Sequence, residues 1–424
     1  MVATPTVYRL AAGTSVEDTP ARVRLVRGTT ATTIECTPGA VRSLVARLAS
    51  GGVTPTDLDA ASADVLYLLT ALEKRGLLAA SVPGLLDVDP LRGVLPLIGA
   101  VAPFSPRLSR FAVLREERGA LTLESPLGAG HAMLIGRRGA ALAGALAAGE
   151  AALDDDERSA VALLSAAGLL AGERERSAQA LAWEWHDLLF HAETRGWSDG
   201  RPRGGTYHLR GLVDPPPDAR PPHGGPAIAL ERAGARAGMP FHAVVERRRA
   251  VRRFADERPV TVSELGHLLD QAATRRAVFE ADGIELSRRP APSGGAIAAL
   301  ELYPSVRLCT GLDAGLYHYE ADAHRLRLID PTPHRFPDGG AQVALAISLR
   351  HARIAWKYQR IAYQLALLDL GVLYQTLWLT ATAMGLGGYP LGSVDAAVFA
   401  RATGLDPLEE TGLGAFLLGR PEAG

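Results

Sequence analysis

The densest basic run in this chain of 424 residues is ERRRAVRRF, which spans residues 246–254. If a helical turn and its exit carry this run, Arg248, Arg249 and Arg252 can converge on one dianionic group. The planar guanidinium binds a phosphate through two parallel hydrogen bonds. Val251 and Phe254 interleave with the arginines, which favours a segment packed against a core over a solvated basic face. The run therefore predicts a phosphate site within a packed domain.

A second motif, PAPSGG at residues 290–295, predicts a rigid turn. Pro292 restricts the backbone ahead of Ser293, and Gly294 and Gly295 let backbone amides approach a flat ligand. The motif is neither a dinucleotide-binding nor a Walker fingerprint, because GxGxxG and GxxxxGK do not occur there. By itself it indicates a close approach of the backbone to a ligand and nothing more specific.

Lysine is rare in this chain, because only Lys74 and Lys357 are lysines among 45 basic residues. Lys357 is followed directly by Tyr358 in an apolar helical stretch. The positive charge of a lysine can lower the pKa of a neighbouring phenol and make it a usable base. The alternative is that one of two lysines precedes a tyrosine by chance.

From Phe241 onward the pattern indicates an α+β domain, residues 241–424, in which helices dominate. The expected helices are 241–250, 261–273, 294–300, one from about 341 to 386 that breaks once, and 394–403. The expected strands are short, and they are Tyr303–Leu308, Gly315–Tyr319, Arg325–Ile329 and Ala415–Leu418.

The first 180 residues indicate a weak internal duplication. Each copy runs from strands to helices and closes on Gly-Leu-Leu, at residues 76–78 and 168–170, where glycine would supply a left-handed helix cap. These features resemble winged-helix modules. We therefore expect two such modules, at residues 1–95 and 100–180, followed by a Pro/Gly-rich connector at 181–240.

Charge argues against nucleic acid as the partner of these modules. Residues 1–90 hold eight basic and nine acidic side chains, and the whole chain has a formal net charge of −1. A protein that binds a nucleic-acid backbone needs an excess of basic side chains on one face. A module of this kind can instead offer a sheet edge to an extended peptide.

Composition also bears on compartment, metals and membranes. Cys36 and Cys309 lie too far apart in sequence to suggest a disulfide framework or a metal site, which fits a reducing cytoplasm. The N-terminus shows no signal peptide pattern. The most apolar stretch, residues 365–386, includes Asp369, so we expect a buried core helix rather than a membrane span.

Residues 241–424 resemble the FMN-dependent nitroreductase-like superfamily and, more narrowly, the SagB-type dehydrogenases that oxidise thiazolines and oxazolines in ribosomally made peptides. The tandem N-terminal modules are similar to those of this group. The resemblance rests on motifs in order: Arg248–Phe254, Pro259-Val260, Pro292–Gly295, Leu300–Tyr303, Gly315–Tyr319, Trp356–Tyr358, Asp369–Gly371, Gln375-Thr376, Ala381–Leu386 and Phe416–Arg420.

The resemblance implies FMN as the cofactor and assigns residues to its phosphate. Arg248 and Arg249 would bind the phosphate, and Arg420 would close on it. Arg252 would face the pyrimidine edge of the flavin and stabilise negative charge there. Ala250 stands where the family usually has serine, so one phosphate hydrogen bond is absent and we expect weaker flavin retention.

The flavin ring would lie between the subunits of a homodimer. The resemblance implies that the turn from Pro292 through Ser293, Gly294 and Gly295 lines the ring from the second subunit. Gly387 and Gly388 would pack beside the ring.

Lys357 and Tyr358 match the family's catalytic Lys-Tyr pair. Oxidation of an azoline removes a proton from one carbon and a hydride from the next, so a base is needed near the flavin. Neighbours on a regular helix point about 100° apart, so both side chains cannot aim at one atom. We expect Tyr358 to be the base and Lys357 its electrostatic modifier, with the reverse assignment left open.

The expected partners are an azoline-containing precursor peptide and a cyclodehydratase. Three alternatives stand beside this prediction. One is a general NAD(P)H-dependent nitro- or quinone reductase, and another is an azoline oxidase acting on a carrier-protein-bound substrate. The third is a winged-helix DNA-binding regulator with a degenerate flavin domain.

Overall fold

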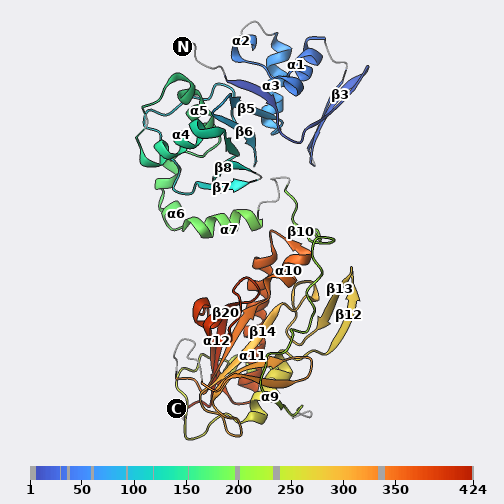
Figure 1. Ribbon diagram of the computed structural model, residues 1–424, viewed down its shortest axis with the longest axis vertical. Helices are drawn as coiled ribbons and strands as arrows, with labels where there is room; N and C mark the ends of the chain where they lie inside the picture. The colour runs from blue at the N-terminus through green and yellow to red at the C-terminus, as the bar shows by residue number, and fades with distance from the viewer. Residues whose placement is uncertain are drawn as a thin grey trace. The chain divides into compact units, whose positions relative to one another are not determined.

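The computed structural model of the protein describes residues 6–28, 30–35, 39–58, 62–91, 94–117, 119–150, 152–195, 201–232, 239–332 and 340–422. The chain forms two compact units, Met1–Arg201 and Pro202–Gly424 (Figure 1). Residues 181–240, the expected connector, are divided between these units. Cys36 lies outside the described residues, and Cys309 is buried and forms no disulfide.

Strands from both halves of the N-terminal unit pair in one six-stranded antiparallel sheet. Its order is β1 (Val7–Leu10), β5 (Leu78–Val82), β6 (Leu86–Pro90), β9 (Gly130–Leu134), β8 (Ala120–Glu124) and β7 (Val113–Glu117). The two halves meet where β6 pairs with β9. A separate three-stranded sheet is formed by β2 (Ser15–Thr19), β3 (Arg22–Arg27) and β4 (Thr30–Glu35).

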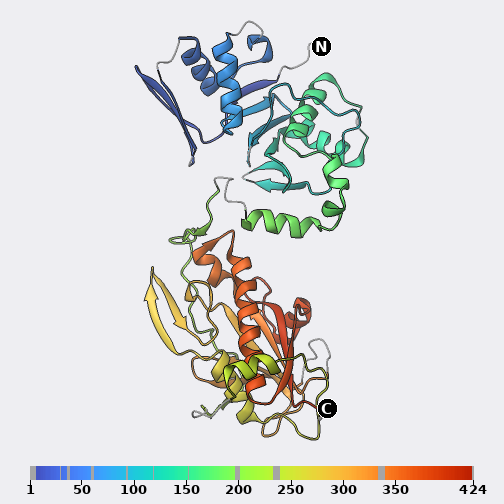
Figure 2. The same ribbon diagram turned by 180° about the vertical axis from the view of Figure 1, so that it is seen from behind.

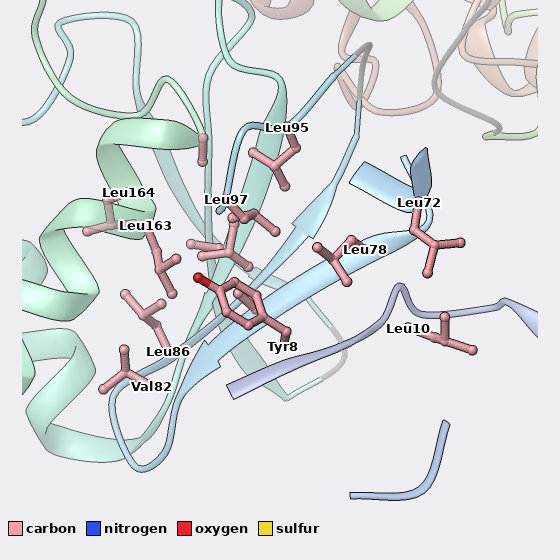
Figure 3. Packing of buried hydrophobic residues seen from close by; sticks show 14 of the residues in the cluster. Tyr8, Leu10, Leu72, Leu78, Val82, Leu86, Leu95, Leu97, Leu163 and Leu164 are labelled. Atoms are coloured by element: carbon pink, nitrogen blue, oxygen red, sulfur yellow. The ribbon is translucent and has the colours of Figure 1, made fainter. Parts of the chain in front are cut away.

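Helices of both halves pack on this sheet around a single hydrophobic core. In Figure 3, Leu163 and Leu164 of α5 lie in the same core as Tyr8, Leu78 and Leu86 of the first half. The helices described in the N-terminal unit are α1 (Gly39–Ser50), α2 (Pro55–Leu58), α3 (Ala63–Lys74), α4 (Gly136–Ala148), α5 (Asp155–Ala166), η1 (Glu173–Arg176), α6 (Ala178–Leu181) and α7 (Trp185–Arg195).

Gly76 and Gly168 have φ angles of 65° and 72°, so both Gly-Leu-Leu triplets begin with a left-handed glycine, as the sequence predicted. The winged-helix character of each half stays a prediction.

The C-terminal unit is built on a seven-stranded antiparallel sheet. Its order is β11 (Ala227–Ala229), β16 (Arg325–Asp330), β15 (Gly315–Glu320), β14 (Leu300–Val306), β17 (Val343–Leu349), β20 (Thr411–Gly419) and β19 (Gly387–Leu391). Two short pairings complete the unit: the hairpin of β12 (Ala277–Ala281) with β13 (Ile284–Arg288), and β10 (Gly204–Gly205) with β18 (Tyr358–Gln359).

Helices cover both faces of this sheet. Leu302 and Ile347 point to the core shared with α9 (Val262–Ala272) and α11 (Ala362–Ala383). Their chain neighbours Tyr303 and Ala346 point to the other face, where α12 (Ala396–Thr403) packs. The two views in Figures 1 and 2 show α11 and α12 on opposite sides of the sheet. The remaining helices are α8 (Phe241–Arg247), η2 (Gly294–Ala296) and α10 (His351–Lys357).

The structure corrects the expected helix over 341–386. Residues 343–349 form the inner strand β17, and only α10 and α11 are helical. A short apolar run buried on both faces of a sheet has no period that separates it from a buried helix. The expected helix 294–300 is likewise a three-residue turn followed by β14.

Helix α11 is long and apolar enough, by length and composition, to cross a membrane. One face of the helix, which includes Ala366, Asp369, Leu373 and Leu377, lies in the core of the C-terminal unit. The opposite face is apolar and exposed.

Candidate active site

The arginine run lies at the edge of the C-terminal sheet. Helix α8 ends at Arg247, and the chain continues in an extended conformation rather than as a further helical turn. Ala250 forms a parallel bridge with Gly388 of β19, and Val251 N donates to Gly388 O at 3.3 Å. A Cβ on Gly387 would lie 2.6 Å from Val251 Cγ1, so this approach requires glycine. The run and the two glycines are thus brought together.

Two guanidinium groups of this segment lie over aromatic rings. Arg248 Cζ is 4.3 Å from the ring centroid of Trp378 in α11, and Arg252 Cζ is 5.1 Å from that of Tyr389 in β19. Within the described ranges, no carboxylate lies within 4.0 Å of Arg248, Arg249 or Arg252. Within the part of the chain that the structure describes, these three arginines therefore carry positive charge that no ion pair neutralises, which suits an anionic ligand.

Arg420 has a different environment from the other arginines. It follows β20, whose Gly419 pairs with Gly387, so it lies at the same end of the sheet. Its Nη2 donates to both carboxylate oxygens of Glu264 at 2.8 and 2.7 Å. Burial raises the pKa of Glu264, but hydrogen bonds from Thr261 and Arg420 outweigh it, so the pKa is lowered. In its predicted role Arg420 would approach a phosphate as an ion-paired arginine, through its Nη1 and Nε donors.

Lys357 and Tyr358 meet over the turn at residues 293–295. A Cβ on Gly295, whose φ is 61°, would lie 2.4 Å from Tyr358 Oη and 3.2 Å from Lys357 Nζ. Helix α10 ends at Lys357, and Tyr358 is extended with φ −107° and ψ 127°. The expectation that regular helix geometry keeps the two side chains apart is therefore wrong. Both side chains can therefore act on the same group of a bound molecule.

Asp369 is the site residue that sequence reasoning missed. Gly294 N donates to Asp369 Oδ1 at 2.9 Å, which ties the turn to α11. Burial raises the pKa of Asp369 to about 6, against the opposing effect of the Gly294 hydrogen bond. Its signals in the sequence were an acid within an apolar helix and its place in the motif Asp369–Gly371, neither of which assigned it a role at the site. A cavity of about 40 Å³ beside it is also lined by Ala291, Pro292 and Ser293.

The pKa of Tyr358 is raised, first by burial and then by the charge of Asp369. This is opposite to the lowering that the sequence led us to expect from Lys357. The effect of Asp369 on this pKa depends on the tertiary fold, because Asp369 is eleven positions beyond Tyr358 and reaches the pair from α11. Tyr358 is consequently a phenol at neutral pH.

Helix α11 connects the two clusters of the site. Asp369 contacts the turn under the Lys-Tyr pair, and Trp378 Nε1 donates to Arg249 O at 3.2 Å. Asp369 and Trp378 are nine positions apart, which corresponds to about 14 Å along a helix axis.

Among the described residues there is no group of three or more His, Cys, Asp or Glu that could hold a metal ion.

Two family models match parts of the chain. Residues 316–420 match the nitroreductase family, and residues 106–199 match the cyanobactin oxidase ThcOx. The C-terminal unit thus contains a segment similar to the nitroreductase family, and the N-terminal unit contains a segment similar to the cyanobactin oxidase ThcOx. Both matches agree with the SagB-type resemblance of the sequence.

Two curated relatives are similar to parts of the chain. A nitroreductase-like protein of Methanocaldococcus jannaschii is 28% identical over 162 residues, which cover 35% of this chain and 77% of the relative. The trifolitoxin-processing protein TfxB of Rhizobium leguminosarum bv. trifolii is 29% identical over 153 residues. That match covers 32% of this chain, and the chain spans only 40% of the length of TfxB.

Two solved structures are also similar. A chain of the E. coli microcin synthetase McbBCD complex, solved with truncated pro-MccB17 bound, is 21% identical with a TM-score of 0.36, covering 55% of this chain and 86% of that one. A nitroreductase-like protein of Desulfovibrio desulfuricans, solved with FMN, is 18% identical with a TM-score of 0.28, covering 44% and 88%.

Proposed function

We propose that the protein is an FMN-dependent dehydrogenase that oxidises thiazoline and oxazoline rings to thiazoles and oxazoles in ribosomally synthesised peptides. Its nitroreductase-family domain identifies an oxidoreductase fold. The observation that carries the finer proposal is the meeting of Lys357 Nζ and Tyr358 Oη over Gly295. Ring oxidation removes a proton from carbon and so needs a base near the flavin, whereas reduction of a nitro group or quinone takes up protons and removes none from carbon.

The arginine-rich segment fits the phosphate of FMN. Arg248 and Arg249 would hold it, because their charges have no carboxylate partner within the described ranges and Arg248 is oriented by Trp378. Arg252 would face the flavin, and Gly387 and Gly388 would give the ring close access to the backbone. Bound FMN would supply the two-electron acceptor for the oxidation.

The Lys-Tyr pair would handle the proton. Tyr358 is held as a phenol by burial and by Asp369, so it must first give up its own proton before it can accept one from the substrate. Lys357 Nζ and Tyr358 Oη both lie over Gly295, and Lys357 carries the charge that would stabilise a Tyr358 phenolate. In the reverse assignment, Lys357 accepts the proton and the Tyr358 phenol orients the substrate.

The remaining parts of the proposal concern partners. The exposed apolar face of α11 supports a homodimer, in which the turn of Ser293, Gly294 and Gly295 lines the flavin of the second subunit. An azoline-containing precursor peptide would be the substrate, and a cyclodehydratase that forms the azoline would be the partner enzyme. We place the reaction in the cytoplasm, with no role for nucleic acid or membrane.

The direct test is the mass of an azoline-bearing peptide incubated with the FMN-loaded protein. We expect the loss of two hydrogen atoms per ring. Tyr358→Phe and Lys357→Ala should each lower the rate by about 10²–10⁴-fold, as is usual when a general base is lost. Flavin content should stay near that of the wild type.

Lys74→Ala is the matched control, because it removes the other lysine of the chain at an exposed position of α3. Near-normal turnover by both site variants would remove the pair from the mechanism. Absence of flavin from the purified protein, together with no binding of added FMN, would overturn the proposal as a whole.

A second candidate is a general NAD(P)H-dependent nitro- or quinone reductase. The match of residues 316–420 to the nitroreductase family favours this candidate as much as the first. The two are separated by adding NADH without a peptide. Rapid bleaching of the flavin absorbance would support the reductase, and a flavin that stays oxidised until an azoline peptide is added would support the dehydrogenase.

A further inference from the structure

The first segment of the C-terminal unit lies along the backbone of the Lys-Tyr pair. Strand β10 pairs with β18, so that Gly204 lies opposite Gln359 and Gly205 opposite Tyr358. Tyr207 N donates to Lys357 O at 3.1 Å. A Cβ on Gly205 would lie 3.9 Å from Tyr358 Cε1 and 4.0 Å from Lys357 Cε, so the backbone there borders both side chains.

The ring of Tyr207 faces the lysine. Lys357 Nζ lies 5.8 Å from the centroid of this ring, within the distance at which an ammonium is attracted to an aromatic face. Trp356 meets the same ring edge-to-face at 5.9 Å. The ring is thus shared between the last two residues of α10.

Contacts from outside the pair fix the position of this ring. The Tyr207 hydroxyl donates to Asp282 Oδ2 at 2.5 Å, in the turn of the β12–β13 hairpin. Arg210 Cζ lies 4.5 Å from the ring centroid, and Arg210 also donates to the backbone carbonyl of Asp282. Tyr207 has a φ of 52°, which a tyrosine adopts only where its surroundings impose it.

We propose that residues 204–213 form a strap that holds the Lys-Tyr pair, and that Tyr207 is the positioning residue for the Lys357 side chain. The strap is closed by Trp356, whose Nε1 donates to Val213 O at 2.9 Å. This proposal rests on the proposed function only in assigning chemistry to the pair. The placement of Lys357 by Tyr207 can be tested without any substrate.

The substrate-free test uses the rarity of lysine. Lys74 and Lys357 are the only lysines, so limited modification by an amine-reactive reagent, followed by peptide mass analysis, reports on each separately. In the full-length protein, Tyr207→Leu should raise the modification rate of Lys357 relative to Lys74 by about two- to fivefold, the ratio that corresponds to one exposed cation–π contact. Tyr207→Phe loses the hydrogen bond to Asp282 but keeps the ring between Trp356 and Arg210, so it should leave the ratio close to that of the wild type.

The second readout is turnover of an azoline peptide by the FMN-loaded protein. Tyr207→Leu should lower kcat by about tenfold or more with KM little changed, because a misplaced base slows the chemical step and not binding. Tyr207→Phe should restore most of kcat. Phe279→Leu is the matched control, because it changes an aromatic residue of the same hairpin that lies against Arg288 and not against the pair.

The outcomes separate the two hypotheses. Altered lysine modification in Tyr207→Leu without any azoline oxidation by the wild type would support the strap and overturn the proposed function. An unchanged modification ratio together with an unchanged kcat would overturn the strap. Equal losses in Tyr207→Leu and Tyr207→Phe would also overturn it, because the Asp282 hydrogen bond rather than the ring would then be the important contact.

Discussion

At the scale of single residues, Asp369 is the group whose charge the fold makes unfavourable. Its pKa of about 6 lies above the ordinary value of 3.8, so the folded protein binds the proton more tightly than the unfolded chain. Ionisation therefore lowers stability progressively as the pH rises from about 4 to about 6, and the loss is complete above that range.

Asp369→Asn should consequently be stabilising at neutral pH. The amide oxygen can still accept the Gly294 hydrogen bond, while the buried charge is gone. In thermal unfolding, the difference in Tm between variant and wild type should grow between pH 4 and 6 and then stay constant. Asp64→Asn, at an exposed position of α3, controls for the loss of a carboxylate as such. A difference independent of pH would contradict the raised pKa.

The sequence indicated which residues of the candidate site lie close together better than it indicated their protonation states. The lysine bias pointed to Lys357, and the paired glycines pointed to a turn that Lys357 and Tyr358 do contact. The pKa direction of Tyr358 was wrong because it depends on Asp369, which reaches the site only when α11 packs against the turn. Contacts between residues far apart in the chain leave no local pattern to read.

At the scale of elements, local sequence signals predicted the start of a helix well and the central strands poorly. Thr261 and Glu264 form a capping box at the start of α9, where the sequence predicted a helix from 261. Strand β17 fell within a predicted helix, because a strand in which six of seven residues are buried inside a sheet shows no regular alternation. The edge strand β19 was missed, because its two glycines and one proline obscure a strand pattern.

Helix α11 also gives a prediction about assembly. Its exposed face carries Tyr363, Leu367, Leu368 and Val372, of which Leu368 is 53% exposed. A contiguous apolar face on a long helix is typical of an interface. If two copies pair through it, the FMN-loaded protein should have a mass of about twice 44.7 kDa by light scattering. Leu368→Arg should shift the mass toward 44.7 kDa and lower flavin content, because flavin would bind the assembled state.

Leu408→Arg is the control for this experiment. Leu408 is even more exposed, at 87%, but lies in the loop before β20. It should leave both the mass and the flavin content unchanged. A wild-type protein with the mass of one chain when loaded with flavin would exclude the homodimer.

At the scale of the whole molecule, the N-terminal unit offers a groove suited to a peptide. Strand β4 is an outer strand of its three-stranded sheet. Beside it lies a hollow of about 390 Å³ whose lining includes Thr33, Ile34, Leu68 and Tyr67, and Tyr67 is 77% exposed. A hollow with apolar side chains beside an outer strand suits the docking of an extended peptide.

We therefore expect the N-terminal unit to contribute to substrate binding and not to chemistry. Tyr67→Ala should raise KM for a full-length precursor peptide by about tenfold or more, since a buried aromatic anchor is often worth more than 1 kcal/mol. It should leave KM for a short azoline peptide unchanged, because that peptide lacks the segment that would occupy the groove. Flavin content should also be unaffected.

Leu114→Ala, which removes an exposed apolar side chain from β7, is the matched control. Equal KM values for the full-length peptide in wild type and Tyr67→Ala would assign the groove no part in recognition, and a loss with both peptides would place the effect in the fold of the unit.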